Sequence, residues 1–279
     1  KQSEVQFSAS GGNEKTNFFA SLGYNKVKGL VKYREFERYS SLLSLSNKAT
    51  NWMELSFKNQ MSYTNQTGRG DQSGQAQGIA TGSPLSMMMG SNPSMKAYNE
   101  DGSYNMSANF SDKVKNALWA LSPEESNVSN KTYRIMNNIG AKIIFTKNLS
   151  FNSNNSVDYF TVKGFNYWGP TSIDGASLKG LGEKNIEEVL SLTSSNVLNY
   201  SKTFNDVHNV DALLGVEAQK YDNNSLFASA SDYSNNILPE LANGQPKGAS
   251  SGYARNFMMS YFGNLNYNYA NKYYLAGSL

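Results

Sequence analysis

Apolar and polar residues alternate along most of this chain with the period of β-strands. The clearest stretch is 53–63. Its apolar face carries Met53, Leu55, Phe57, Met61 and Tyr63, and its polar face carries Glu54, Ser56, Lys58, Gln60 and Ser62. Similar alternation occurs at 18–25, 209–219 and 256–269, and a weaker form at 36–46, 131–146, 149–164 and 188–202. Because successive strand residues point to opposite faces, and because 4–10 and 272–279 also fit, the pattern predicts roughly ten strands.

The predicted strands are long. Many cover roughly 11–16 residues, whereas strands of globular proteins usually cover about 5–6. A tilted strand that crosses a bilayer needs about 9–11 residues and can continue beyond it. Strand length therefore favours a transmembrane barrel over a soluble sandwich.

The connections alternate between two lengths. Short turns are expected at 11–15, 47–51, 147–148, 204–207 and 270–271. Between them lie a modest connection at 31–35 and long loops at 65–130, 165–187 and 221–254. Short periplasmic turns on one rim and long extracellular loops on the other are typical of outer-membrane barrels. The predicted fold class is all-β, a transmembrane antiparallel β-barrel.

Aromatic residues cluster near the predicted strand ends. They include Tyr33, Phe36, Tyr39, Tyr63, Tyr159, Phe160, Tyr200, Phe204, Tyr267, Tyr269, Tyr273 and Tyr274. In a barrel such residues form girdles at the two membrane interfaces. The alternative is that aromatic residues simply favour strands.

The long loops contain the candidate binding residues. Short helices are expected at 84–90 and 111–121, and Asn99–Ser103 has the composition of a turn. We expect Trp119, Tyr167 and Trp168 to lie near a substrate vestibule, because loop aromatics can stack on sugars or peptide side chains. The alternative is that these rings pack the loops onto their neighbours.

The composition excludes most kinds of catalytic site. The 279 residues include no Cys and one His, which excludes disulfides, zinc–thiolate sites and cysteine nucleophiles. His208 is expected to be solvated in a turn, and the adjacent Glu187 and Glu188 point to opposite faces of a strand. A net charge of +3 without a basic stripe argues against nucleic acid. We therefore expect no enzyme, no cofactor and no metal.

Three segments carry a resemblance to a known family. They are Ser10–Thr16 followed by Phe36–Ser40, the segment Phe204–Glu217, and Tyr261–Tyr267 with Tyr273–Leu279. These segments resemble the SusC/RagA family, the TonB-dependent outer-membrane transporters of the Bacteroidetes. In that family an Arg-rich stretch usually follows the last segment, so the sequence is expected to be part of the barrel domain of a longer protein.

The resemblance implies a barrel of about 22 strands with an N-terminal plug. The plug domain, the TonB box and the C-terminal part of the barrel are not in residues 1–279. The implied function is TonB-energised import of glycans or oligopeptides into the periplasm. The implied partners are a SusD-like surface lipoprotein, TonB through a segment not present here, and outer-membrane lipid. A dimer of transporter–lid pairs is one assembly that the resemblance allows.

In such a barrel the polar strand faces meet the lumen and the plug. The candidate lumen-facing residues are Glu54, Lys58, Gln60, Asp211, Glu217 and Asn264. Two other readings stay open at this point: a passive outer-membrane barrel, and a structural or adhesive surface β protein. A β-helix enzyme would need internal repeats of about 20–25 residues, and the sequence contains none.

Overall fold

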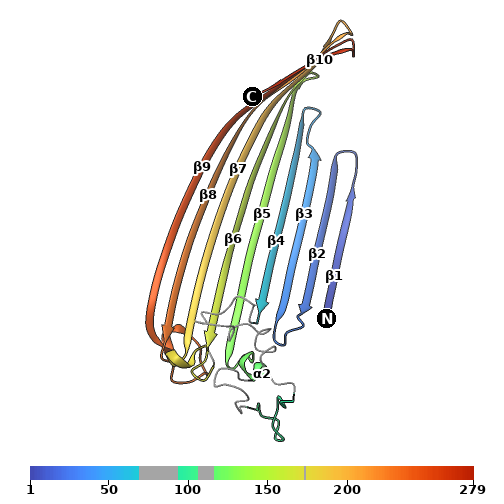
Figure 1. Cartoon of the computed structure of the whole chain (residues 1–279). Coiled ribbons are helices and arrows are strands. Elements are labelled where there is room, and N and C mark those ends of the chain that lie inside the picture. The colour runs from blue at the N-terminus through green and yellow to red at the C-terminus, as the bar shows by residue number, and fades with distance from the viewer. Residues whose placement is uncertain (69–93, 106–115, 173) are drawn as a thin grey trace.

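The described residues form ten strands in a single antiparallel sheet, ordered as in the sequence (Figure 1). The computed structural model describes residues 1–68, 94–105, 116–172 and 174–279. The strands are β1 (Gln2–Gly12), β2 (Thr16–Lys28), β3 (Glu35–Lys48), β4 (Met53–Thr67), β5 (Ser126–Thr146), β6 (Leu149–Trp168), β7 (Leu181–Phe204), β8 (His208–Ser231), β9 (Gln245–Tyr269) and β10 (Tyr273–Ser278). The predicted all-β class and the expected number of strands are confirmed.

Helical structure is sparse in the described ranges. The helix α2 (Ala117–Ala120) lies within the predicted helix 111–121, and η1 (Ala176–Leu178) and η2 (Leu241–Asn243) are single 3-10 turns. The predicted helix at 84–90 falls outside the described residues. No helix in the described ranges has both the length and the apolar character to cross a membrane.

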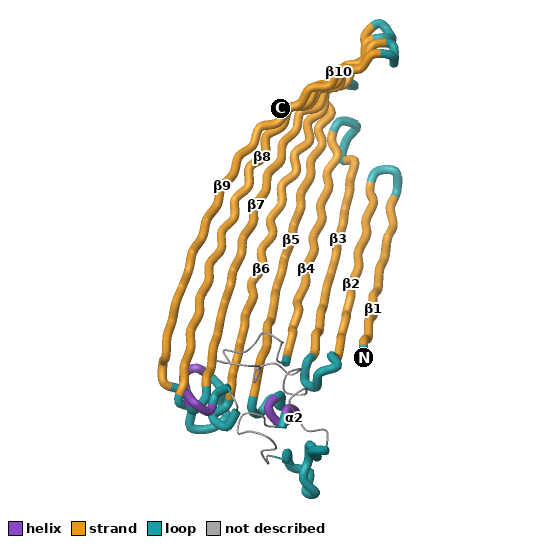
Figure 2. The backbone as a smooth tube through the Cα atoms, viewed as in Figure 1, coloured by secondary structure: helices purple, strands orange, loops and turns teal. Residues whose placement is uncertain are grey.

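The short and the long connections lie at opposite ends of the sheet. Figure 2 shows tight turns at one end of the strands and the long connections at the other. Two of the tight turns place consecutive residues at positive φ, Asn205 with Asp206 and Ala270 with Asn271. Such backbone matches the right-handed twist of paired strands and lets each hairpin close at once. The predicted alternation of short and long connections is confirmed.

The strands run further into the long-loop end than expected. The connection predicted at 165–187 covers only 169–180, and the one predicted at 221–254 covers only 232–244. The predicted loop 65–130 begins after β4 and ends before β5 at 126. The 221–254 boundaries were wrong because residues 221–231 and 245–254 are rich in Asn, Ser and Gly and lack regular apolar alternation, although the ladder between β8 and β9 continues through them.

The strand register divides the sheet into two chemically different faces. We call the first the apolar face. It carries the large exposed side chains Phe7, Leu22, Leu214, Phe257 and Tyr261, which are 64–72% exposed. The second, the polar face, carries all six lumen-facing candidates: Glu54, Lys58, Gln60, Asp211, Glu217 and Asn264. A one-residue shift in register would exchange the faces, so the pairing fixes this division.

Buried apolar residues lie at the long-loop end and not across the sheet. Among the described residues, the buried apolar set consists of Trp119, Ala120, Leu121, Val128, Tyr167, Trp168, Leu181, Val189, Ala230 and Tyr233. A single sheet whose apolar face is exposed gains little from the hydrophobic effect in water. The apolar face therefore requires a nonaqueous environment or a covering surface.

Candidate functional site: the long-loop rim of the sheet

A tyrosine cluster organises one half of the long-loop rim. Tyr167 at the end of β6 packs edge-on against Tyr233 of the 232–244 connection, with ring centroids 5.1 Å apart and an interplanar angle of 84°. The two side chains are 1% and 3% exposed, and Ala230, Phe165 and Leu241 pack around them. Burial raises the pKa of the Tyr233 phenol. This geometry fixes the 232–244 connection against the strand ends.

The carboxylate of Glu125 joins three connections at the rim. Thr171 Oγ1 donates to its two oxygens at 2.9 and 2.7 Å, and Asn236 Nδ2 donates to Oε1 at 3.5 Å. The hydroxyl of Tyr167 in turn lies 3.2 Å from Asn236 Oδ1. Residues before β5, after β6 and after β8 are thereby tied together. We call the Tyr167–Tyr233 cluster and this network the rim platform.

A second cluster lies where the long connection before β5 meets the short connection between β2 and β3. The hydroxyls of Tyr33 and Tyr104 share a hydrogen bond of 2.9 Å, and the Tyr98 and Tyr104 rings stack at 5.3 Å. Trp119 of α2 packs with Tyr104. Asn116 caps α2 by accepting from Leu118 N at 3.0 Å. Segments more than 70 residues apart in the sequence are thus held at one place.

The three vestibule candidates do not converge. Tyr167 and Trp168 are consecutive buried residues at the end of β6 whose side chains project from opposite faces of the sheet, and Trp119 is 8% exposed in the other cluster. Their positions support the packing alternative, because covered rings hold the loops together. A direct contact with substrate stays a prediction. The sequence did not predict the roles of Glu125 and Tyr233, because neither lies in a recognisable motif and their partners come from distant segments.

The polar face presents separate hollows. Glu54 lines one of about 320 Å³ with Lys15, Lys48 and Lys142, and Asp211 lines another of about 350 Å³ with Asn266. The lumen candidates therefore share a face but not a site. On the same face the Arg134 guanidinium donates two hydrogen bonds to the Asp158 carboxylate, of 2.9 and 2.5 Å. Its Cζ lies 5.9 Å from the centroid of the Phe160 ring. This pair fixes the Arg134 side chain on the polar face.

Two rows of aromatic side chains border the apolar face. Towards the long loops, Tyr24, Tyr39, Tyr63 and Tyr133 occupy one register row, with successive ring centroids 5.0, 6.2 and 4.8 Å apart. Tyr24 and Tyr133 were missed in the sequence analysis. Towards the turns, the row consists of Phe204, His208, Tyr269 and Tyr273, and Tyr267 lies in the adjacent row of the same face. Phe36, Phe160 and Tyr274 belong to the polar face. The rows have the placement expected of interfacial girdles.

His208 differs from the prediction of a solvated turn residue. It is the first residue of β8, and its Nδ1 lies 2.7 Å from the Tyr267 hydroxyl. Its ring stacks on Tyr267 with centroids 6.0 Å apart and packs at a tilt of 44° against Tyr269 with centroids 5.0 Å apart. Its partners come from β9 through the register, which the turn composition alone does not reveal. The residue is part of an aromatic row.

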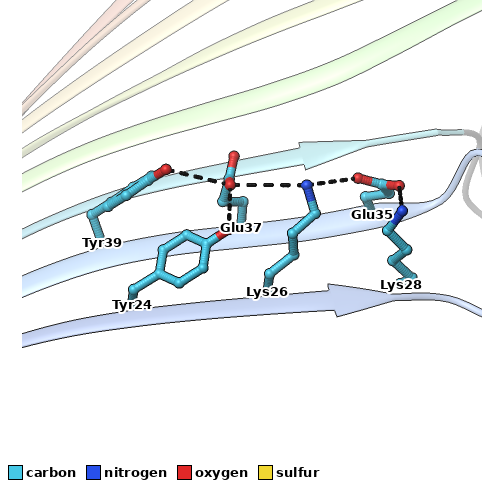
Figure 3. A network of polar contacts seen from close by, with 6 residues as sticks. All are labelled: Tyr24, Lys26, Lys28, Glu35, Glu37 and Tyr39. Carbon is cyan, nitrogen blue, oxygen red and sulfur yellow. Dashed lines mark hydrogen bonds and ion pairs between the residues drawn. The ribbon is translucent and has the colours of Figure 1, made fainter. Parts of the chain in front are cut away.

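Beyond the tyrosine row, the apolar face becomes charged (Figure 3). Tyr24 donates to Glu37 at 2.7 Å, and Lys26 lies 3.2 Å from Glu35 and 4.0 Å from Glu37. Lys28 pairs with Glu35 at 3.4 Å. Because exposed ion pairs contribute little free energy, this network marks a change of environment more than a source of stability. The apolar belt ends at the tyrosine row on these strands.

A pH dependence is expected at the 99–103 turn. Hydrogen bonds from the Ser103 hydroxyl (2.6 Å) and amide (2.9 Å) hold the pKa of Asp101 below its ordinary value. A carboxyl with a lowered pKa stabilises the fold above its unfolded pKa of about 4 and loses that contribution as pH falls through the folded pKa. Hydrogen exchange should show the Ser103 amide losing protection below about pH 4. An Asp101→Ala variant should lack this step, and an unchanged step there would contradict the assignment.

In sequence, the chain is similar to curated TonB-dependent receptors. It is 26% identical to TonB-dependent receptor P3 of Formosa agariphila over 276 residues, which is 97% of this chain and 27% of that protein. TonB-dependent receptor P26 of the same organism is also 26% identical, over 96% of this chain and 26% of its own length. The chain thus spans about a quarter of the length of these curated relatives. No protein-family profile matches the chain.

Among solved structures, the RagAB peptide transporter has the same fold. It superposes with a TM-score of 0.83 at 19% identity, covering 99% of this chain and 31% of that one. The RagAB peptide importer in its 'open-open' state gives a TM-score of 0.80 at 18% identity. The described sheet therefore corresponds to one part of a larger barrel.

Proposed function

We propose that this chain is part of the β-barrel of a TonB-dependent receptor of the SusC/RagA type and forms the wall of an outer-membrane nutrient importer. The apolar face lies against lipid, and the polar face lines the lumen and contacts a plug. The long-loop rim lies outside the cell, and the short turns lie in the periplasm. These assignments of side and environment form the first part of the proposal.

The observation that carries this proposal is the coincidence of two asymmetries in one sheet. An apolar face bordered by two aromatic rows is the expected lipid contact of a barrel. In addition, the short connections lie at one end of these strands and the long connections at the other. A soluble sandwich does not require either feature.

Strand length supports the same placement. The strands β7, β8 and β9 contain 24, 24 and 25 residues, which corresponds to roughly 80 Å at a rise of 3.4 Å per residue. The hydrocarbon core is only about 30 Å thick. These strands therefore have the length to cross the membrane and continue outward as a wall that supports the rim platform.

The second part of the proposal concerns the partners. A SusD-like surface lipoprotein covers the long-loop rim, and TonB supplies energy through a segment that residues 1–279 do not contain. The RagAB structures, which are of a peptide importer, support this arrangement through the shared fold. The rim platform supports it physically, because loops fixed by Glu125 and Tyr167 offer a preorganised surface. Two such transporter–lid pairs form the proposed dimer.

The third part concerns the cargo, an oligopeptide or a glycan. It passes the polar face, where Glu54, Lys58, Gln60, Asp211, Glu217 and Asn264 contact the plug or the cargo. Trp119, Tyr167 and Trp168 shape the vestibule by holding its loops. Their substitution is expected to alter lid binding and uptake through loop position.

Uptake measurements test the import function. In a strain that lacks the gene, accumulation of labelled oligopeptides or oligosaccharides should fall to the background level, and the complete protein should restore it. A protonophore should abolish the restored uptake, because TonB coupling depends on the inner-membrane proton gradient. Diffusion of a small sugar through porins serves as the control. Uptake that persists in the presence of the protonophore would favour a passive barrel, and unchanged uptake in the deletion strain would favour a structural or adhesive protein.

A further inference from the structure

Two lysines face each other on the apolar side of the sheet. Lys131 of β5 and Lys163 of β6 are direct register partners, and both side chains are exposed. They lie one register row beyond Tyr133, towards the long loops. Like charges directly opposite each other destabilise an antiparallel pair. Such an arrangement is favourable when an anion binds between the two ammonium groups.

Neighbouring lysines on the same face have acidic partners, but these two do not. Lys26 and Lys28 pair with Glu35, and Lys184 pairs with Glu240. Within the described ranges, neither Lys131 nor Lys163 lies within ion-pair distance of a carboxylate; Lys163 Nζ is instead 5.9 Å from the centroid of the Tyr133 ring.

The nearest carboxylates along this face are already engaged. Glu37 and Lys131 lie in one register row, with Asn65 of β4 between them. The Glu37 carboxylate accepts a hydrogen bond of 2.7 Å from the Tyr24 hydroxyl. Glu188, on β7, accepts from Tyr159 at 3.3 Å. These hydrogen bonds orient both carboxylates towards tyrosine hydroxyls, and neither carboxylate forms an ion pair with Lys131 or Lys163 in the described part of the chain.

An apolar groove begins directly below the lysine row. Its volume is about 570 Å³, and it crosses β1 to β5. The lining includes Val5, Phe7, Leu22, Tyr39, Met61, Tyr63, Tyr133 and Ile135. Ser41 lies between Leu22 and Met61 in the register. Because its side chain is small, the space between the Leu22 and Met61 side chains stays open. The tyrosine row forms the end of this groove that is nearer to the lysines.

We propose that the groove and the lysine pair together bind one phosphorylated membrane lipid. An acyl chain lies in the groove, the tyrosine row lies at the level of the lipid interface, and the phosphate lies between Lys131 and Lys163. Interfacial lysines attract anionic headgroups, and aromatic rings favour the same depth. The inference rests on the proposed function in one respect, namely that the apolar face contacts lipid.

Native mass spectrometry of the complete protein in detergent tests the site with three probes. These are a diacyl phosphatidic acid, the matching diacylglycerol and inorganic phosphate. The wild type should retain phosphatidic acid far better than either of the others. At about 1 kcal/mol per interfacial lysine, Lys131→Gln and Lys163→Gln should each weaken phosphatidic acid binding about 5-fold, and the double variant roughly 30-fold. Lys184→Gln is the matched control and should have little effect, because that lysine already pairs with Glu240.

A groove variant separates the lipid from a free anion. Ser41→Phe should weaken phosphatidic acid binding while both lysines stay in place. Equal binding by the wild type and the double lysine variant would overturn the proposal. Inorganic phosphate that binds as well as the lipid and is insensitive to Ser41→Phe would also overturn it, in favour of a free-anion site. Because the assay measures no import, absent nutrient uptake in cells would contradict only the proposed function.

Discussion

A Leu214→Arg substitution should lower the free energy of unfolding by about 2–4 kcal/mol. Leu214 lies near the middle of the apolar stretch of β8 and is 67% exposed. If that face contacts lipid, the guanidinium must enter the hydrocarbon region and lose its hydration. Urea-dependent unfolding of the complete protein in phospholipid vesicles measures the change.

The neighbouring residue provides a matched control. Leu213 precedes Leu214 on the same strand and projects from the polar face, where it pairs with Asn264 in the register. A Leu213→Arg substitution should change the free energy of unfolding by less than about 1 kcal/mol, since the charge can stay hydrated on a polar surface. A larger loss for Leu213→Arg than for Leu214→Arg would reverse the assignment of the two faces.

A Tyr167→Ala substitution should cost about 3–5 kcal/mol of local stability in the rim platform. The variant removes a ring that is 1% exposed, its edge contact with Tyr233 at 5.1 Å and its hydrogen bond towards Asn236. Hydrogen exchange should show faster opening of the 169–180 and 232–244 connections. The ladder of β4 and β5 should keep its protection, because its hydrogen bonds are independent of the cluster.

Ile237→Ala is the control for this experiment. Ile237 lies in the same 232–244 connection but is 87% exposed, so removing its side chain leaves no cavity. Exchange in this variant should match the wild type. If Tyr167→Ala also left exchange unchanged, the rim platform would not be held by its tyrosine cluster, and preorganisation of the rim would lose its basis.

The β-strands were predictable from the sequence wherever the chain has one apolar and one polar face. At 53–63 the alternation places each side chain on its observed face, and the register confirms it. Alternation carries no information where both faces are hydrated. For this reason the sequence predicts a loop for the last part of β8, around Asn223, and the first part of β9, around Gly252. In the structure these two segments pair with each other.

The candidate site was less predictable, because it is assembled from distant segments. Tyr167 and Tyr233 are 66 positions apart, and the Asn236–Glu125 hydrogen bond spans 111. Short-range periodicity cannot detect such contacts. The lysine pair at 131 and 163 likewise becomes visible only when the register aligns β5 with β6. Family resemblance indicated the type of protein but not these contacts.

Cysteine accessibility in intact cells tests most directly which side of the membrane each rim occupies. The chain has no Cys, so a substitution introduces the only thiol of this segment. The variants are Ile237→Cys in a long connection and Lys147→Cys in a tight turn, with the unsubstituted protein as background. A membrane-impermeant maleimide should label Ile237→Cys in intact cells and Lys147→Cys only after the outer membrane is opened. Labelling of Lys147→Cys but not Ile237→Cys in intact cells would contradict the proposed orientation, and equal labelling of both would contradict a barrel that spans the outer membrane.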